Sequence, residues 1–272
     1  MKANTTTLGL IFLILSACKT GDKQGNGEDV SIVFKDDAGH SISKDDLKNI
    51  TGQVNFEITT NQDIDVVAKA LHDEARMLGQ EGKYDSAIIK LKLAMQIQPN
   101  WAYPPYDLAY TYLLKKDFDS AYKYYQITDQ LEPRGFFTVK TAVHTLEGER
   151  QKIYPKGLYA MYSSLEWEED SAKKSSMAKS FLELAPNFAP AWKEVALLSN
   201  NVEEKERVID QGLSKDPDAD TKGILLINKA IVLNEKGKKD EAKQILGKLI
   251  FSQDATIGNV ELAKFTLKSI TE

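Results

Sequence analysis

The sequence predicts a mainly α-helical protein, an α-solenoid of stacked helical hairpins with a small α+β element near the N-terminus. Pro99 and Pro133 each close a segment of the same design, and they lie 34 residues apart, which is the period of solenoids built from paired helices. From Ile64 onward, apolar residues recur at the spacing of helices that bury one side. The composition agrees, because 42% of the residues are hydrophobic, 28% are charged and only 8 are prolines.

Residues 1–17 have the features of an export signal. Lys2 gives a positive start, and an apolar run from Leu8 to Leu15 follows. Spanning about 30 Å of hydrocarbon takes roughly 20 residues, and this run is shorter. The segment is therefore interpreted as a cleaved signal peptide.

The tetrapeptide that ends at Cys18 resembles the bacterial lipobox, in which a branched residue and two small ones precede a cysteine that is acylated and becomes the mature N-terminus. Cys18 is the only cysteine in the chain, so it cannot form an intramolecular disulfide. The resemblance implies palmitate on Cys18 and firm anchoring, because two or three acyl chains hold a protein where one is marginal. The alternative is an ordinary signal peptide cut at Ala17 beside an incidental cysteine.

Residues 18–29 form a polar, glycine-bearing tether that spans about 18 Å if flexible. The folded part is then expected to stay close to the bilayer. Lys19 follows the cysteine, where enteric-type bacteria place Asp in lipoproteins that stay at the inner membrane. Delivery to the outer membrane is therefore expected, with the periplasmic or surface orientation left open.

Residues 30–60 are predicted to form a small β-α-β element. Apolar Val30, Ile32 and Phe34 share one face of a strand, and apolar and polar residues alternate from Val54 to Ile58, as in a half-buried strand. Between them, Ser43 fits a helix start and Gly52 a helix end. The piece is too small for a core of its own, so we expect it to dock on the first hairpin. Its aspartates lack the ligand order of an EF-hand loop and are interpreted as turn and cap residues.

Residues 64–133 hold two matched hairpins. Small residues recur at the same places in both, with Ala75 and Ala109 in the first helix and Ala87 and Ala121 in the second. Two antiparallel helices approach closely only where small residues face each other and larger ones fill the flanking grooves. These alanines are therefore the expected points of contact within each hairpin.

In these positions the two segments resemble the tetratricopeptide repeat (TPR), in frames that begin at Ala68 and Ala102. The family pattern has a small residue at position eight, Leu or an aromatic residue at eleven, Ala at twenty and Pro at thirty-two, and both segments match it. The match departs at the family's early tryptophan, where Leu71 and Pro105 stand.

The repeat signal weakens over residues 134–217, which are predicted to be irregular helical repeats. Pro186 follows Pro133 by 53 residues and Pro217 follows Pro186 by 31, so one stretch is expected to carry an extra helix and another to be shortened. Residues 218–254 resemble a further TPR unit, and residues 255–272 are predicted to form a C-terminal capping helix. The residues that fit the repeat frame in that unit are Ala230, Leu233, Gly237, Ala242, Leu246 and Leu249.

The TPR resemblance implies a concave groove lined by the first helix of each hairpin, with positions two, five and nine of the frame facing a partner. In the second unit these positions are all tyrosines, which supply contact area and a hydroxyl at low entropic cost and could hold an extended peptide. The alternative is that these rings pack against the N-terminal element or an extra helix. The candidate groove residues are Lys69, His72 and Arg76 in the first unit and Tyr103, Tyr106 and Tyr110 in the second.

Other site classes receive little support. A clamp for a C-terminal carboxylate is disfavoured, because Asp107 stands where the family's clamp has Asn, although Arg76 could still pair with an acidic ligand. The chain has 3 histidines, none in an HExxH or paired-ligand spacing, so no metal site, cofactor or enzymatic activity is expected. A net charge of -5 without a basic stripe argues against nucleic-acid binding.

These features predict a membrane-anchored TPR scaffold that binds a protein or peptide partner in the bacterial cell envelope, without a chemical step. The alternative is a structural subunit of an envelope or outer-membrane assembly complex, such as the barrel-assembly machinery, where large permanent interfaces replace peptide capture. An accessory enzyme is the least favoured class.

Overall fold

The computed structural model describes residues 31–35, 41–42, 55–59, 63–166, 168, 170–199 and 201–271. The chain divides into two units, one of residues 1–62 with 271–272 and one of residues 63–270. The signal peptide, Cys18, the tether and the helix expected after Ser43 lie outside the described residues.

The described residues of the first unit form a three-stranded antiparallel sheet. Its strands are β1 (Ser31–Lys35), β2 (Ser41–Ile42) and β3 (Asn55–Thr59), in the order β2-β1-β3. Phe34 of β1 lies opposite Phe56 of β3 and opposite Ile42 of β2. β1 and β3 fall where the alternating pattern predicted strands, whereas β2 is too short to show such a pattern.

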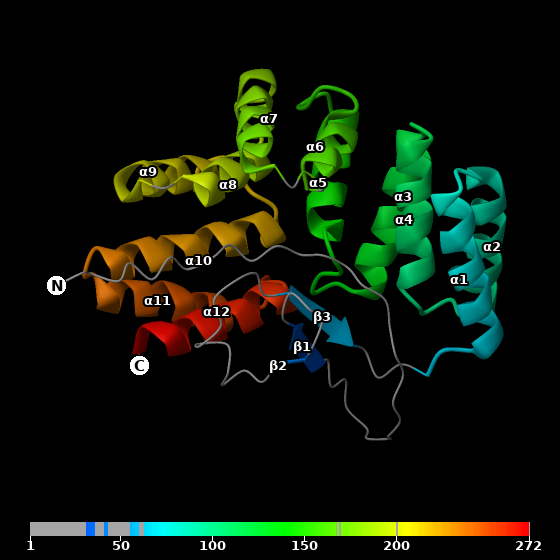
Figure 1. Ribbon diagram of the computed structural model, residues 1–272, viewed down its shortest axis with the longest axis horizontal. Coiled ribbons are helices and arrows are strands. Elements are labelled where there is room, and N and C mark those ends of the chain that lie inside the picture. Colours follow the sequence, from blue (N-terminus) through cyan, green and yellow to red (C-terminus); the bar gives the residue numbers. More distant parts are fainter. Residues whose placement is uncertain are drawn as a thin grey trace. The chain divides into compact units, whose positions relative to one another are not determined.

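The described residues between 63 and 271 form helices joined by short connections, and Figure 1 shows the helices following one another as a series of hairpins. In the figure the axes of α1 to α7 run in one direction, and those of α8 to α12 turn across them. The helices are α1 (Val66–Gln80), α2 (Tyr84–Ile97), α3 (Tyr103–Leu114), α4 (Phe118–Leu131), α5 (Val139–Arg150), α6 (Leu158–Glu166), α7 (Ser171–Leu184), α8 (Ala189–Leu198), α9 (Val202–Leu213), α10 (Ala219–Glu235), α11 (Lys239–Ile250) and α12 (Ile257–Thr271).

Helices α1 to α4 form two TPR-type hairpins in which each helix packs on the next. The expected contact residues are buried, with exposed fractions of 2% for Ala75, 1% for Ala87, and 0% for both Ala109 and Ala121. Ala75 and Ala87 share one hydrophobic cluster, and Ala109 and Ala121 share another. Small residues therefore bring the helices of each pair together.

The turns inside these hairpins also repeat, with one difference. Gly82 joins α1 to α2 with a φ of 73°, a left-handed conformation that glycine adopts without strain. Lys116, which lies 34 residues later, takes the same role with a φ of 60°. The side chain of Asp117 then accepts a hydrogen bond from the Ser120 N–H and caps α4.

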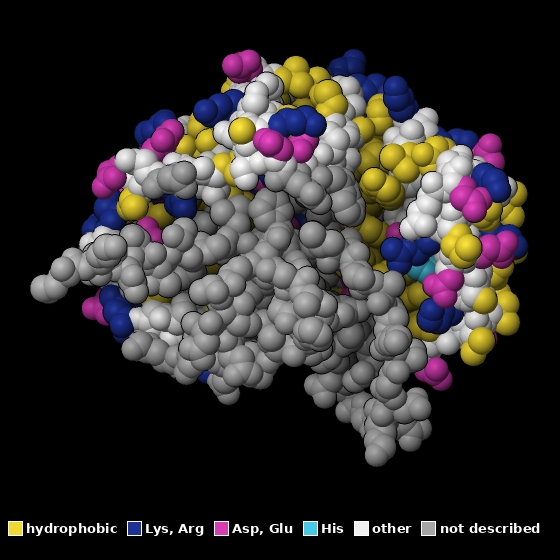
Figure 2. Space-filling model, in the orientation of Figure 1, with side chains coloured by type: hydrophobic (Ala, Val, Ile, Leu, Met, Phe, Trp, Pro, Cys, Tyr) yellow, Lys and Arg dark blue, Asp and Glu magenta, His cyan; other side chains and the backbone are white. Residues whose placement is uncertain are grey.

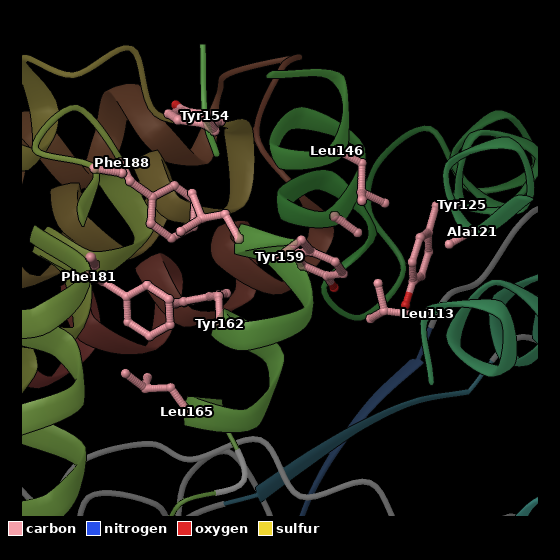
Figure 3. Close-up of a cluster of buried hydrophobic side chains, with 14 of the residues drawn as sticks. Leu113, Ala121, Tyr125, Leu146, Tyr154, Tyr159, Tyr162, Leu165, Phe181 and Phe188 are labelled. Atoms are coloured by element: carbon pink, nitrogen blue, oxygen red, sulfur yellow. The ribbon is translucent and has the colours of Figure 1, made fainter. Parts of the chain in front are cut away.

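The region from α5 to the start of α8 is organised around aromatic side chains, whereas α9 packs against α8 and α10 in a separate cluster of buried aliphatic residues. Figure 3 shows the aromatic cluster, in which tyrosines and phenylalanines from α4 to α8 meet edge to face. The ring centroids of Tyr125 and Tyr159 are 5.8 Å apart, and those of Tyr162 and Phe188 are 5.2 Å apart. Such pairs add to the stability that burial alone provides.

Buried carboxylates also fix this region. Glu149 accepts hydrogen bonds from the backbone N–H groups of Gly157 at 2.6 Å and Tyr159 at 2.8 Å, which holds the start of α6 against the end of α5. Glu194 of α8 accepts a hydrogen bond from the Tyr162 hydroxyl at 3.0 Å, and its other oxygen is 3.8 Å from the buried ammonium of Lys174 on α7.

One contact departs from the predicted solenoid. In a solenoid each repeat touches only its neighbours. Here α5 also contacts α10, where the Thr141 hydroxyl donates to Asp218 at 3.1 Å. The Ile257 N–H donates to the Arg134 carbonyl at 2.9 Å, which adds the start of α12 to this junction. The long connection through α6 to α9 therefore returns the chain to α5. No helix among the described residues is both long enough and apolar enough to cross a membrane.

Candidate partner-binding surface

His72 links the two regular hairpins. Its Nε2 atom lies 2.8 Å from an Asp107 carboxylate oxygen, and its ring meets the Trp101 ring at a centroid distance of 4.8 Å. The side chain is only 4% exposed. His72 was predicted to face a partner, and this prediction is wrong, because the side chain is buried. Its ring nitrogen contacts Asp107 of α3 and its ring packs against Trp101, which precedes α3.

Lys69 and Arg76 keep part of their surface open. Their side chains are 41% and 42% exposed. Lys69 pairs with Asp73 at 2.7 Å, and the Arg76 guanidinium Nε lies 3.9 Å from the Asp107 carboxylate that already binds His72. A partly engaged guanidinium can still bind an incoming carboxylate with its remaining donors.

The predicted tyrosines lie against two phenylalanines that follow the second hairpin. The Tyr103 ring lies 4.9 Å from Phe136 and 5.6 Å from Phe137, and the Tyr106 ring lies 5.5 Å and 5.0 Å from the same two rings. Tyr110 packs against the main hydrophobic cluster. Tyr103 and Tyr106 therefore pack against the segment before α5, and all three tyrosines are half-buried.

The segment before α5 is held in place tightly enough to position these phenylalanines. Gly135 has a φ of 100°, and a Cβ at that position would lie 2.8 Å from the Thr256 side chain. Only glycine therefore fits there. Phe137 itself has a φ of 48°, an uncommon conformation for a bulky residue. We call the half-buried set Tyr103, Tyr106, Tyr110 and Phe137 the aromatic face.

The positions of the three tyrosines have equivalents one repeat later in the chain, beyond the two units that the sequence pattern identified. Phe137, Lys140 and His144 follow the three tyrosines by 34 residues. Sequence reasoning missed them because residues 134–138 depart from the TPR pattern, although adding the period once more would have found them. Phe137 touches Tyr103 and Tyr106, so the first residue of this third set joins the aromatic face.

The other two residues of the third set line a pocket with a volume of about 560 Å³. Its walls come from α4, α5, the loop after α5, the turn before α8 and the turn that leads into α10. The His144 Nε2 atom lies 3.5 Å from the hydroxyl oxygen of Tyr154, which forms another wall. Tyr154 approaches α5 closely because Gly148 has no side chain, since a Cβ there would lie 2.3 Å from the tyrosine ring. Among the described residues, no three His, Cys, Asp or Glu side chains are arranged to hold a metal ion.

No family model matches the chain, and no curated protein matches it. TTC0263, a thermophilic TPR protein of Thermus thermophilus, resembles it at 16% sequence identity over 75% of this chain and 100% of that chain, with a TM-score of 0.33. YrrB, a TPR protein with an unusual peptide-binding site, shows 14% identity over 75% and 98%, with a TM-score of 0.32. The TPR2AB domain of yeast Sti1, in complex with pHSP90, shows 14% identity over 75% and 86%, with a TM-score of 0.36. TM-scores of this size carry no argument about function, and the description of the fold rests on the hairpins and their buried alanines.

Proposed function

We propose that this protein is a lipid-anchored scaffold of the bacterial cell envelope that binds an extended segment of a partner protein. The observation that carries the proposal is the aromatic face, a set of half-buried rings from α3 and from the segment before α5. The exposed Arg76 is connected to this face by a series of contacts, because its guanidinium lies beside Asp107, Asp107 pairs with His72, and the His72 ring lies against Tyr103. Rings that are held by packing lose little conformational entropy on binding, so they make good contact points for a peptide.

Binding is tested by recovering partners from native membranes with the full chain and a variant that combines Tyr103→Ala with Arg76→Ala. We expect the variant to lose about nine-tenths of the recovered partner, since aromatic and Arg side chains dominate interface energies. Leu184→Ala, on an exposed position of α7, serves as the control and should recover the partner normally. Circular dichroism and thermal melting check that each variant is folded. A folded variant that recovers its partner in full would contradict the proposal.

The anchor rests on the lipobox at Cys18, in a part of the chain outside the described residues. We expect Cys18→Ala to abolish incorporation of labelled palmitate and to release the protein from the membrane fraction. Separation of inner and outer membranes on a density gradient tests the expected outer-membrane location, and protease treatment of whole cells tests the orientation. Palmitate incorporation that survives the substitution would refute lipidation at this cysteine.

The second candidate, a permanent subunit of an assembly complex, is favoured by one surface feature. Ile89, Leu93 and Ile97 lie on one side of α2 and are 58%, 41% and 42% exposed. Figure 2 shows hydrophobic side chains along the edge that α2 forms. Exposed apolar ridges of this kind are typical of protein interfaces. A stoichiometric complex that survives purification and is lost in Leu93→Glu would favour this candidate over exchangeable peptide binding.

A further inference from the structure

The pocket beside α5 has a size and a wall composition that suit a specific ligand. Its volume of about 560 Å³ lies within the range of small-ligand sites. Tyr122 of α4 and Tyr154 of the following loop provide aromatic walls, and Ile153, which is 55% exposed, lies at its rim. The pocket is larger than one side chain needs, so it can take a residue together with part of its neighbours.

The charges that line the pocket are mainly negative. Its walls carry four carboxylates and two lysines. One of these lysines, Lys140, is already neutralised, because its ammonium nitrogen lies 2.8 Å from a carboxylate oxygen of Asp129. Asp218 is also engaged, since it caps α10 and accepts the hydroxyl hydrogen bonds of Thr141 and Thr221.

Two further carboxylates remain, Glu147 and Asp216, opposed by Lys215. Asp216 and Lys215 form no ion pair with another described residue, whereas Glu147 accepts a hydrogen bond from the Gln151 side chain at 2.6 Å and lies 3.9 Å from the Arg150 guanidinium. A hydrogen bond from the Tyr122 hydroxyl lowers the pKa of Glu147, so this carboxylate stays ionised near neutral pH. Burial raises the pKa of Tyr154, and the charges of Asp216 and Asp218 raise it further, as expected beside a negative field.

The Tyr122 ring, which forms one wall of the pocket, already contacts a cation of the chain itself, Arg150, which does not line the pocket. The guanidinium carbon of Arg150 lies 4.9 Å from the centroid of the Tyr122 ring, within the range of a cation–π contact. The half-buried Glu147, the exposed Asp216 and the aromatic walls together favour a positive group that carries an apolar stem, because the rings and Val143 can cover the stem while the carboxylates meet the charge.

We propose that this pocket binds a cationic group, the ammonium of a lysine or the guanidinium of an arginine, with Asp216 and Glu147 supplying the opposite charge. The ligand is expected to be a basic residue of the partner segment, and in that respect the proposal rests on the proposed function. Lys140 and His144 continue the register of Tyr106 and Tyr110, so a segment that follows the register from α3 to α5 reaches this pocket. Recognition here would depend on charge, whereas the aromatic face offers mainly apolar contact.

Small probes test the pocket on the purified full chain. Acetyl-Ala-Lys-Ala-amide is titrated into the protein, and binding is followed by calorimetry or NMR. The comparison ligands are the same tripeptide with norleucine or glutamate in place of lysine, and 1,5-diaminopentane. We expect the lysine probe to bind about tenfold more tightly than the norleucine probe and to weaken as salt is raised, since partly exposed charges are screened. Equal binding of the norleucine or glutamate probe would overturn the proposal.

Three variants test where the ligand binds and whether negative charge attracts it. Asp216→Asn combined with Glu147→Gln should weaken the lysine probe about tenfold, and Lys215→Gln should strengthen it by about twofold, because removing a like charge lowers repulsion. Asp240→Asn removes one carboxylate from an exposed position of α11 that does not line the pocket, and it should leave binding unchanged. If the carboxylate variant binds like the parent chain, or if Lys215→Gln weakens binding, the assignment is wrong.

The two sources of the cation give different results. Binding of the lysine tripeptide supports a protein segment as ligand, whereas binding of 1,5-diaminopentane alone supports the cation site with a free amine as its ligand. If neither binds, the proposal fails. Recovery of the partner through the aromatic face is measured in a separate experiment. The two proposals can therefore fail independently, because the probe titrations do not depend on partner recovery and partner recovery does not depend on the titrations.

Discussion

The regular hairpins, α1 to α4, and the region from α5 to α8 reach the same helical packing in different ways. The hairpins are held by small residues that recur at a fixed period, and their buried alanines form the helix contacts. In the second region the contacts come from edge-to-face aromatic rings and from buried carboxylates such as Glu149 and Glu194. A repeat can be extended one unit at a time, whereas a buried polar network fixes one particular arrangement because every member needs its partner.

The largest expected effect tests the polar network of the second region. Glu194→Ala removes a buried carboxylate that lies 3.8 Å from the Lys174 ammonium and 2.8 Å from the Lys193 ammonium, and we expect a loss of about 3–5 kcal/mol in the free energy of unfolding. Glu183→Ala, an exposed position on α7 without an ion pair to a described residue, should change stability by less than about 0.5 kcal/mol. Urea denaturation followed by circular dichroism measures both. Equal, small effects would mean that the buried polar network adds nothing to stability.

A smaller effect is expected at the helix contacts of the regular hairpins. Ala121→Leu forces extra volume between α3 and α4, which should cost roughly 1–3 kcal/mol, and Ala87→Leu should cost a similar amount between α1 and α2. Ala70→Leu, on an exposed position of α1, is the matched control and should be close to neutral. Melting temperatures measure the series. If the two buried positions differ widely, the two repeats are not equivalent in the way that their sequences suggest.

The turns of the two hairpins should respond in opposite directions. Lys116→Gly relieves a left-handed residue with a φ of 60° and should stabilise the protein by about 1 kcal/mol. Gly82→Ala places a side chain at a φ of 73° and should destabilise it by about the same amount, although nothing lies within 4 Å of the added Cβ. Denaturant midpoints compare the pair. The same sign for both changes would show that backbone strain does not govern these turns.

The smallest effect is expected for an ion pair that crosses from the regular to the irregular region. Asp119 pairs with Arg150 at 2.6 Å, as Asp85, 34 residues earlier, pairs with Lys115. Both carboxylates are exposed, so Asp119→Asn and Asp85→Asn should each cost about 0.2–1 kcal/mol at low salt and less at high salt. Unfolding at two salt concentrations measures this. A much larger loss of unfolding free energy for Asp119→Asn would mean that the contact between α4 and α5 stabilises the protein more than a surface ion pair does.

The sequence predicted the helical fold well because its signals are local. The period of 34 residues, the alternation of apolar residues and the repeated alanines each depend on a few neighbouring positions, and the structure places Ala75, Ala87, Ala109 and Ala121 where that pattern required. The candidate site was harder to predict. The frame marked His72 as a surface residue, but its surroundings bury it against Trp101 and Asp107, and the repeat frame does not encode such a neighbourhood.

The sequence by itself determined the helical hairpins, because their pattern joins residues close together in the chain, and the prediction of lipidation at Cys18 rests on a local pattern in the same way. Only the tertiary structure decided that α10 returns to α5 through Thr141 and Asp218, and that Tyr122, Glu147 and Asp216 line one pocket. The physical reason is that such contacts join residues far apart in the chain, where no spacing rule applies and where the fit of particular side chains selects the arrangement.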